Sequence, residues 1–553
     1  MKIFCFILLL LVSGAQAQLN TITREYVPIT HQLSKAPLFG MNLENWTAFA
    51  YNAQNNEWRA VPFQFDQLNE NGHYETSPPD TANANDELCM LPEDLGDRAP
   101  ASIWLDDDAT QQLPRLELEF VDPLNPDQKG WVYLYQNVSN VPIIPSFLSY
   151  IPGPEGTPAA DTIVTAAYTL GHDQNGWMDY LSLASNKSKN LVDRFKLRLA
   201  GSSSLVGGEY EINETWVEAS TSEDAVKFYK GSVRAFHEID ASILLEKLNL
   251  ILLPDRADFS YHFQYFPYSF QIAAETDLDP GLIALFGVKL IRQSLDLNQN
   301  AIGMQMYSPR NREGIFIDGL PDDVNLAIEP GNEQNWLMAS GPQGTILIVF
   351  EISSIEKSNK QLYYYDNENG STADGTEDTG ILGSYGDMGI LIQATGSAFK
   401  TRDKLTVNYK GYFIDRPNTN VTFGEQIMAW ENHPLQLNAT EQFYEPSWVD
   451  HDDTLHPETF ELRPAYPNPF NPVKQAHTRI EFRGEPSHMY DMVIYNILGQ
   501  HVAQFQNMQS SHGSHTIQWD GRNEQGAPIN PGIYFYSVSN GSETFTKKLI
   551  VQH

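Results

Sequence analysis

Aromatic residues alternate with other residues along positions 258–273, and this pattern constrains the fold more than any other. Phe259, Tyr261, Phe263 and Tyr265 are each separated by one position. Because successive side chains of an extended strand point to opposite faces of a sheet, the spacing predicts a β-strand with one aromatic face. Strand-like runs recur elsewhere, so we predict an all-β protein with a multidomain β-sandwich body. Two short apolar runs, 241–250 and 281–294, are expected to be helices.

Charged residues divide the chain into two parts. Its 553 residues include 35 Lys and Arg and 70 Asp and Glu, a formal net charge of -35, whereas the two signs are equal in number after position 463. An acidic surface repels phosphate backbones, so we expect no nucleic-acid partner. Charge and loop composition predict a leader at 1–17, an N-terminal β domain at 18–141, a connector at 142–161, a larger β-sandwich domain at 162–430, a linker at 431–463 and a C-terminal domain at 464–553.

The first 17 residues have the order of a secretory signal peptide. Lys2 is followed by an apolar run and then by Ala15-Gln16-Ala17, in which Ala15 and Ala17 mark the expected cleavage site. No later run approaches the roughly 18 apolar residues of a transmembrane helix, so we expect no transmembrane segment. Cys89 then remains as the single cysteine and is expected to be buried. We predict a secreted or outer cell-surface protein.

Short alternating runs between positions 478 and 551 predict a small terminal β-sandwich, with Asn540-Gly541 suited to a type I′ hairpin turn. Prolines precede it and fix φ, which predicts a stiff, extended lead-in. Five motifs follow one another in this region: Tyr466-Pro467-Asn468-Pro469-Phe470-Asn471-Pro472, Ile494-Tyr495-Asn496-Ile497-Leu498-Gly499-Gln500, Trp519-Asp520-Gly521, Pro531-Gly532-Ile533-Tyr534 and Lys547-Lys548-Leu549.

In this order the motifs resemble the type A C-terminal sorting domain of the type IX (Por) secretion system. The hairpin at Trp519-Asp520-Gly521 is also similar to the immunoglobulin-like domain of the flagellar hook cap. The resemblance implies an immunoglobulin-like β-sandwich at the C-terminus, recognised by the type IX secretion machinery of a Gram-negative bacterium. The body bears a weaker resemblance to uncharacterised bacterial extracellular proteins, through residues 58–66, 85–88 and 94–99.

The body contains no complete catalytic motif, and two constellations remain as candidate sites. His172, Asp173 and Trp177 lie on a loop that also contains Gly171 and Gly176. An imidazole, an acid and an indole can bind a sugar by stacking and hydrogen bonding or do acid/base chemistry, although an ordinary loop explains them more simply. Asp366, Asp374 and Asp378 lie in an oxygen-rich, Gly-punctuated segment, which suggests a Ca²⁺ site without the EF-hand spacing.

These observations predict a protein exported by the type IX system whose body is a β-sandwich binding or structural module. The alternative is a secreted polysaccharide-active enzyme, a lyase or glycoside hydrolase. Its catalytic carboxylate pair cannot be selected from a sequence this acidic, because the separation that defines such a pair is spatial. The sequence does not assign the ligand of such a module, for which polysaccharide is one candidate.

Overall fold

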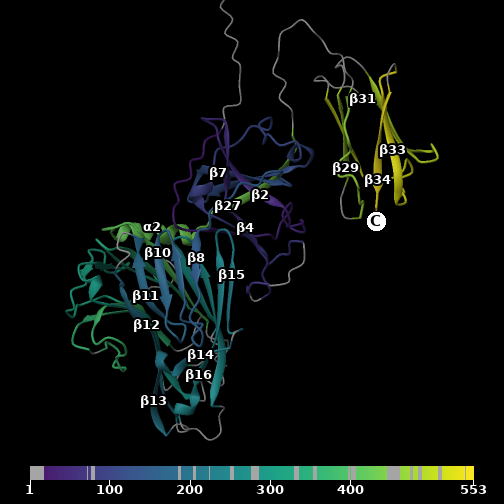
Figure 1. Ribbon diagram of the computed structural model, residues 1–553. Helices are drawn as coiled ribbons and strands as arrows, with labels where there is room; N and C mark the ends of the chain where they lie inside the picture. Colours follow the sequence, from purple (N-terminus) through teal and green to yellow (C-terminus); the bar gives the residue numbers. More distant parts are fainter. Residues whose placement is uncertain are drawn as a thin grey trace, which may run out of the picture. The chain divides into compact units, whose positions relative to one another are not determined.

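The protein is described by a computed structural model (Figure 1). The residues that it describes are 18–70, 72–75, 81–184, 189–203, 207–222, 224–248, 255–275, 286–328, 335–352, 358–370, 372–396, 399, 406–444, 461–473, 477–483, 489–508, 514–541 and 544–552. The expected leader, with Ala15 and Ala17, lies outside them. The chain divides into two compact units, Met1–Ser447 and Trp448–His553. Antiparallel sheets build both units, which confirms the all-β prediction.

Two sheets form the N-terminal part of the first unit. The β1 sheet has the order β1 (Ile29–Gln32), β5 (Glu87–Met90) and β4 (Gln64–Asp66). The β2 sheet has the order β27 (Gln436–Gln442), β6 (Arg115–Asp122), β7 (Asn125–Gln136), β2 (Trp46–Asn52) and β3 (Glu57–Val61). A shared apolar core of residues such as Leu88, Leu118 and Val132 joins them.

A larger sandwich follows, in which two sheets pack together against a third. The β10 sheet has the order β11 (Met178–Leu183), β10 (Tyr168–His172), β9 (Thr162–Thr165) and β8 (Leu148–Ile151). The β12 sheet has the order β13 (Gly208–Asn213), β12 (Val192–Ser203), β19 (Val288–Leu297), β25 (Ser384–Ala394) and β24 (Ser358–Asn367).

The β16 sheet covers both of them. Its order is β14 (Val217–Ala219), β16 (Ala235–Leu244), β17 (Arg256–Tyr265), β18 (Ser269–Glu275), β26 (Thr406–Ile414), β23 (Gly344–Ile352), β22 (Trp336–Gly341), β20 (Gln305–Tyr307) and β21 (Ile315–Phe316), with β15 (Val226–Lys230) also paired to β16. The alternating aromatics of β17 face the core between the sheets, where Tyr261, Phe263 and Tyr265 are buried. The period-2 pattern therefore builds the core.

Several predicted elements differ from the structure. Residues 241–244 end strand β16 and Leu245–Leu248 form a 3₁₀ turn, while residues 288–294 belong to β19; both helix predictions are wrong over these residues. The α-helix whose bounds are described is α2 (Val421–Asn432), which begins at the Asn420 N-cap. The expected connector 142–161 contains strand β8, and the expected linker 431–463 contains β27.

Strand β27 closes the first unit. It pairs with β6 over seven residues, from Gln436 opposite Val121 to Gln442 opposite Arg115. In Figure 1 the green β27 accordingly lies among the purple and blue strands of the N-terminal part. The chain therefore returns, after the large sandwich, to a sheet begun nearly 400 residues earlier.

The second unit is a sandwich with its own core. One sheet joins β28 (Glu461–Leu462), β29 (Thr478–Arg483) and β32 (Ser514–Trp519), and the other joins β31 (His501–Met508), β30 (Tyr490–Asn496), β33 (Gly532–Ser539) and β34 (Thr544–Val551). Phe470, Phe482, Trp519 and Tyr536 fill the space between them. None of these strands pairs with a described strand of the first unit.

Candidate functional site

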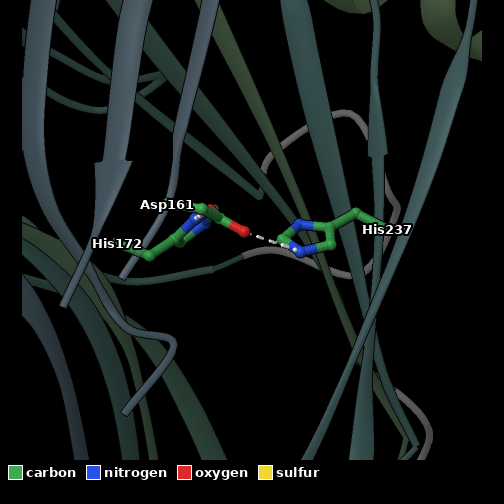
Figure 2. Close-up of side chains that lie close together, drawn as sticks. All are labelled: Asp161, His172 and His237. Atoms are coloured by element: carbon green, nitrogen blue, oxygen red, sulfur yellow. Dashed lines mark hydrogen bonds and ion pairs between the residues drawn. The ribbon is translucent and has the colours of Figure 1, made fainter. Parts of the chain in front are cut away.

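A buried cluster of one acid and two imidazoles joins the β10 and β16 sheets. Asp161 directly precedes β9, His172 ends β10 and His237 lies near the start of β16 (Figure 2). A register shift between Gly171 and His172 interrupts the pairing of β10 with β11 at this point. The nitrogen and oxygen atoms with which these side chains could bind a metal all lie within 4.8 Å of one another. Among the described residues, no other group of three or more His, Cys, Asp or Glu side chains meets this condition.

The four polar side chains at the centre of the cluster contact one another in a ring. His172 Nδ1 lies 2.7 Å from Asp161 Oδ1, and His237 Nε2 lies 3.0 Å from Asp161 Oδ2. The phenolic oxygen of Tyr265 completes the ring, 3.2 Å from His172 Nε2 and 3.4 Å from His237 Nδ1. Tyr150 adds a hydrogen bond from outside, because its hydroxyl donates to Asp161 Oδ2 at 3.1 Å.

Burial controls the charge of these groups. The side chains of Asp161, His172 and His237 are at most 1% exposed. Burial alone would raise the pKa of Asp161, but the contacts with His172 and His237 outweigh it and hold that pKa well below its usual range. Burial lowers the pKa of His237, against the opposing effect of Asp161. The cluster therefore combines an ionised carboxylate with a neutral imidazole at neutral pH.

This arrangement can hold a proton or a metal ion, but it lacks access to a polymer substrate. Phe263 and Phe228 lie beside the imidazoles, with ring centroids 5.1 Å from His172 and 5.6 Å from His237. A catalytic group must come within hydrogen-bond distance of its substrate. The cluster is enclosed by core residues, and its chemistry is therefore internal to the fold.

The predicted sugar-binding group is not assembled as a surface. His172 belongs to the buried cluster, while the carboxylate of Asp173 accepts the backbone N–H groups of Asn175 and Trp177 and so forms the turn. The Trp177 indole is 8% exposed, stacks on Phe195 at 5.5 Å and donates to the Glu214 carbonyl. These three side chains have structural roles in a turn and its adjoining core.

The predicted calcium ligands have separate partners. Asp366 accepts backbone N–H groups of Asp318 and Gly319 at 2.8–3.1 Å. Asp374 lies 3.3 Å from Arg292 Nε, and Asp378 lies 2.7 Å from Lys196 Nζ. The structure does not bring the three carboxylates to a common point, so nothing in it supports the calcium prediction.

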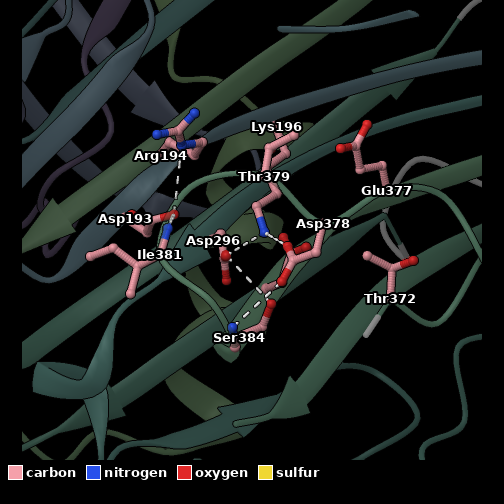
Figure 3. A network of polar contacts seen from close by, with 12 residues as sticks. Asp193, Arg194, Lys196, Asp296, Thr372, Glu377, Asp378, Thr379, Ile381 and Ser384 are labelled. Atoms are coloured by element: carbon pink, nitrogen blue, oxygen red, sulfur yellow. Dashed lines mark hydrogen bonds and ion pairs between the residues drawn. The ribbon is translucent and has the colours of Figure 1, made fainter. Parts of the chain in front are cut away.

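Asp378 instead belongs to a polar network on the β12 sheet (Figure 3), and Asp374 pairs with Arg292 of the same sheet. Buried Lys196 bridges Asp378 and Asp296, whose Oδ2 lies 2.6 Å from Lys196 Nζ. Burial and the neighbouring Asp387 raise the pKa of Asp296 well above its ordinary value. Asp193 accepts the backbone N–H of Ile381. These contacts fasten residues 372–384 onto the sheet.

Several motif residues of the second unit have identifiable roles in its folding. Phe470, Trp519 and Tyr534 are buried, and Trp519 Nε1 donates to the Arg522 carbonyl. Gly521 has φ +75°, and a Cβ there would lie 3.0 Å from atoms of Phe470 and Pro472. Asp520, Gly532 and Lys548 are exposed, and Gly499 lies in an exposed turn. Asn468 and Lys548 are joined by a side-chain to backbone hydrogen bond; the remaining motif residues Pro467, Pro469, Asn471, Pro472 and Lys547 are half-buried or exposed.

An open hollow of about 430 Å³ lies on the N-terminal part of the first unit. Three half-buried aromatic residues line it, Trp46, Phe63 and Phe65, together with Glu44, Asn45 and Gln67. The rings of Phe63 and Phe65 meet edge to face at 5.3 Å. Aromatic faces beside amide and carboxylate groups are suited to polar ligands with apolar faces.

Little in the sequence indicates the partners of His172. Asp161 precedes a short strand in a region expected to be a connector, and His237 lies 65 positions beyond His172. Strand pairing and the packing of sheets bring these residues together, so no spacing rule could identify the cluster. The hollow likewise joins residues 43–46, 63–67 and Ser232.

One family model matches part of the chain. Residues 471–543 match the FlgD Ig-like domain. The matched segment lies within the second unit and includes Trp519-Asp520-Gly521. The C-terminal unit is thus similar to an immunoglobulin-like domain, in agreement with its two-sheet architecture. None of the curated proteins compared with the chain matches it.

Solved structures align over long stretches with low scores. PorZ of the type-IX secretion system of Porphyromonas gingivalis aligns at 10% identity and a TM-score of 0.14, covering 76% of this chain and 73% of PorZ. Dimeric latent PorU of P. gingivalis aligns at 11% identity and 0.15, covering 78% and 36%. The adhesin domain of Epf from Streptococcus pyogenes aligns at 8% and 0.13, covering 66% and 99%. Scores at this level carry no argument about fold or function.

No described helix is long and apolar enough to cross a membrane.

Proposed function

We propose that this chain is a cell-surface or secreted protein exported by a type IX secretion system, with the second unit as its sorting signal and the first unit as a β-sandwich binding module. The observation that carries the proposal is the autonomy of the second unit. It has its own sheets and its own apolar core, and its ordered motifs resemble a type A sorting domain. A signal that is read by export machinery must fold and be presented independently of its cargo.

A turn with exposed apolar side chains supports recognition of this unit by a protein partner. Ile497 and Leu498 follow β30 and are 68% and 77% exposed. Apolar side chains exposed side by side at a turn gain free energy when a partner covers them. Buried motif residues such as Trp519 act through folding, whereas these two are available for contact. We assign the first contact with the secretion machinery to this turn.

Export is tested by fusing residues 448–553 behind a signal-peptide-bearing reporter in a type IX-competent host. The fusion should reach the cell surface, and it should stay in the periplasm of a strain that lacks the secretion channel. Replacement of Ile497 and Leu498 by Ser should cause periplasmic accumulation while the unit remains folded by circular dichroism. Val473→Ser is the matched control, because Val473 is 79% exposed outside this turn. Periplasmic retention of the unmodified fusion would reject the sorting role.

For the ligand of the first unit we propose polysaccharide bound at the open hollow. Sugar rings have apolar faces that stack on aromatic side chains and hydroxyls that bond to amides and carboxylates. Trp46 Nε1 donates to the Asn42 carbonyl, which fixes the indole against the hollow. Glu44, Asn45 and Gln67 provide the polar groups beside it.

Retention of the chain on immobilised plant, algal and bacterial polysaccharides tests this ligand. Trp46→Ala should weaken retention at least tenfold, whereas Phe316→Ala, at an exposed aromatic residue on β21, should leave it unchanged. Equal retention of both variants would remove the hollow from consideration. The same panel assayed for reducing ends and unsaturated products tests the enzymatic alternative, since turnover would replace the binding role by catalysis.

A further inference from the structure

We propose that Asp161, His172 and His237 bind a divalent transition-metal ion, with Zn²⁺ as the best match, and that this ion ties the β10 sheet to the β16 sheet. The Asp161 carboxylate lies just before β9, the His172 imidazole at the end of β10 and the His237 imidazole near the start of β16. Figure 2 shows both rings directed at the carboxylate from opposite sides. The proposal concerns the interior of the first unit and is independent of the export route.

The count of protons in the ring of contacts is the first argument. With neutral imidazoles, His172 Nδ1–H and His237 Nε2–H point at Asp161, and the single Tyr265 proton bonds to only one of the two remaining nitrogens. The contact between His237 Nδ1 and the Tyr265 hydroxyl then has no proton, and it is the longest of the four at 3.4 Å. An ion bound by His172 Nδ1, His237 Nε2 and Asp161 moves both protons to the outer nitrogens. Both N–H groups then donate to the Tyr265 oxygen.

The second argument is the poor geometry of a buried contact. His237 Nε2 is fully buried and has no hydrogen bond of acceptable geometry, although it lies 3.0 Å from Asp161 Oδ2. This nitrogen is directed at the carboxylate and so at the position that an ion would take between them.

Charge gives the third argument. Asp161 is a buried carboxylate, and the described residues around it provide no Lys or Arg within ion-pair distance. The imidazoles and Tyr150 stabilise this carboxylate through short polar contacts, but no Lys or Arg among the described residues neutralises it. A divalent cation supplies that positive charge, and its binding to imidazole and carboxylate donors releases the protons that they carry.

The donor set selects the type of metal. Two imidazole nitrogens and one carboxylate oxygen favour Zn²⁺ and its first-row neighbours over Ca²⁺ and Mg²⁺, which prefer oxygen ligands. Tetrahedral bonds of about 2.0–2.1 Å place ligand atoms roughly 3.3 Å apart. The two contacts at 2.7 and 3.0 Å would therefore widen by a few tenths of an ångström on binding. Tyr150, on Asp161, and Tyr265, on the outer nitrogens, would orient the ligands.

The site lies where a cross-link between sheets is useful. Asp161 and His172 flank the β9–β10 hairpin of the β10 sheet, whereas His237 belongs to the β16 sheet. These sheets pack only through side chains, so an ion would add a fixed connection across the core. We therefore expect the ion to act on stability, with no role in turnover.

The metal content of the full chain tests the proposal. Protein refolded with Zn²⁺ and freed of unbound ion by gel filtration should retain one zinc per chain by mass spectrometry. Co²⁺ in its place should give the intense visible absorption bands of a four-coordinate ion with nitrogen ligands. Zn²⁺ should also raise the thermal midpoint of the first unit, by linkage.

Two substitutions test whether the ion binds at this cluster. His237→Gln should lose the zinc and the cobalt bands, while His262→Gln, on neighbouring β17, should retain both. Folded wild-type protein that retains no zinc after refolding with it would overturn the proposal, and a proton on His237 would then be what completes the ring. Zinc retained equally by wild type and His237→Gln would also overturn it. Because the first result needs no variant, the proposal can fail even if His237→Gln does not fold.

Discussion

At the scale of single residues, buried charges show which side chains the fold depends on. Arg234, directly before β16, is buried and donates through Nε to Asp66 at 2.9 Å and through Nη2 to Glu87 at 2.8 Å. Its partners lie on β4 and β5, so this one guanidinium joins the β1 sheet to the β16 sheet. Burial raises the pKa of Asp66, and Arg234 opposes that shift.

We predict that Arg234→Met destabilises the first unit by about 3–5 kcal/mol, because removing one partner leaves a buried, uncompensated carboxylate. Chemical denaturation of the full chain measures the change. Arg256→Met is the control: Arg256 pairs with Glu218, both side chains are about half exposed, and the expected effect is below about 1 kcal/mol. Equal effects of the two substitutions would contradict the prediction.

Asp366 gives a pH prediction. Burial raises its pKa to about 6, with Asp318 and Asp322 contributing in the same direction against the bonds from backbone N–H groups. The folded protein therefore binds a proton more tightly than the unfolded chain, so this residue makes stability fall as pH rises from about 4 to 6. Asp366→Asn, whose carbonyl can still accept those N–H groups, should remove this decrease and raise stability at pH 7. Unfolding midpoints across pH 4–8 check it; an unchanged slope would refute it.

At the scale of elements, β27 shows how a weak local pattern can have a large structural effect. Its apolar residues Leu437 and Ala439 pack against the core of the N-terminal part, while the alternate residues Gln436, Asn438 and Thr440 are exposed. Pairing with β6 also covers the edge of the β2 sheet on that side. An uncovered edge strand exposes unpaired backbone groups.

We predict that Leu437→Asp destabilises the N-terminal part of the first unit by about 1–3 kcal/mol, since a charge would be placed against an apolar core. Hydrogen exchange should be faster in peptides from β6 and β7 and unchanged in β23 and β26. Gln436→Asp, at an exposed position of the same strand, is the control. Unchanged exchange in β6 would show that β27 contributes little to the sheet.

The sequence predicts the strands with the clearest alternation and fails where pairing is decided at a distance. Strand β17 follows directly from its aromatic period, and its burial follows from the same residues. Residues 288–294 contain an apolar run that suits a helix or a strand, and pairing with β12 on one side and β25 on the other decides for the strand. Strand β27 has two apolar side chains and a partner more than 300 positions away, so its segment resembles a linker.

Functional residues, too, can be predicted from the sequence only where their partners are close along the chain. Motifs that fold locally, such as Trp519-Asp520-Gly521, can be read from the sequence because the turn and its bonds involve neighbouring residues. In the sequence, His172 is a candidate binding residue because of its neighbours Asp173 and Trp177. Its actual partners, Asp161 and His237, come from another strand and another sheet. Local sequence cannot carry information about contacts that depend on how whole sheets pack.

At the scale of the whole molecule, the division into two units has a thermodynamic consequence. The described core of the second unit, with Phe470 and Trp519, shares no residue with the cores of the first. Cooperative unfolding follows cores, so each unit should unfold in its own transition. A unit that unfolds separately can also be altered without destabilising the other unit.

We predict that Phe470→Ala lowers the midpoint of one calorimetric transition only, because a fully buried phenyl ring is removed from the second unit at a cost of about 3–5 kcal/mol. Phe413→Ala, at an equally buried position on β26, should lower only the other. Scanning calorimetry of the full chain and of residues 448–553 measures both, and the isolated unit should reproduce the transition that Phe470→Ala shifts. If each substitution moved both transitions together, the two units would share their stability, and a separate sorting domain could not be maintained.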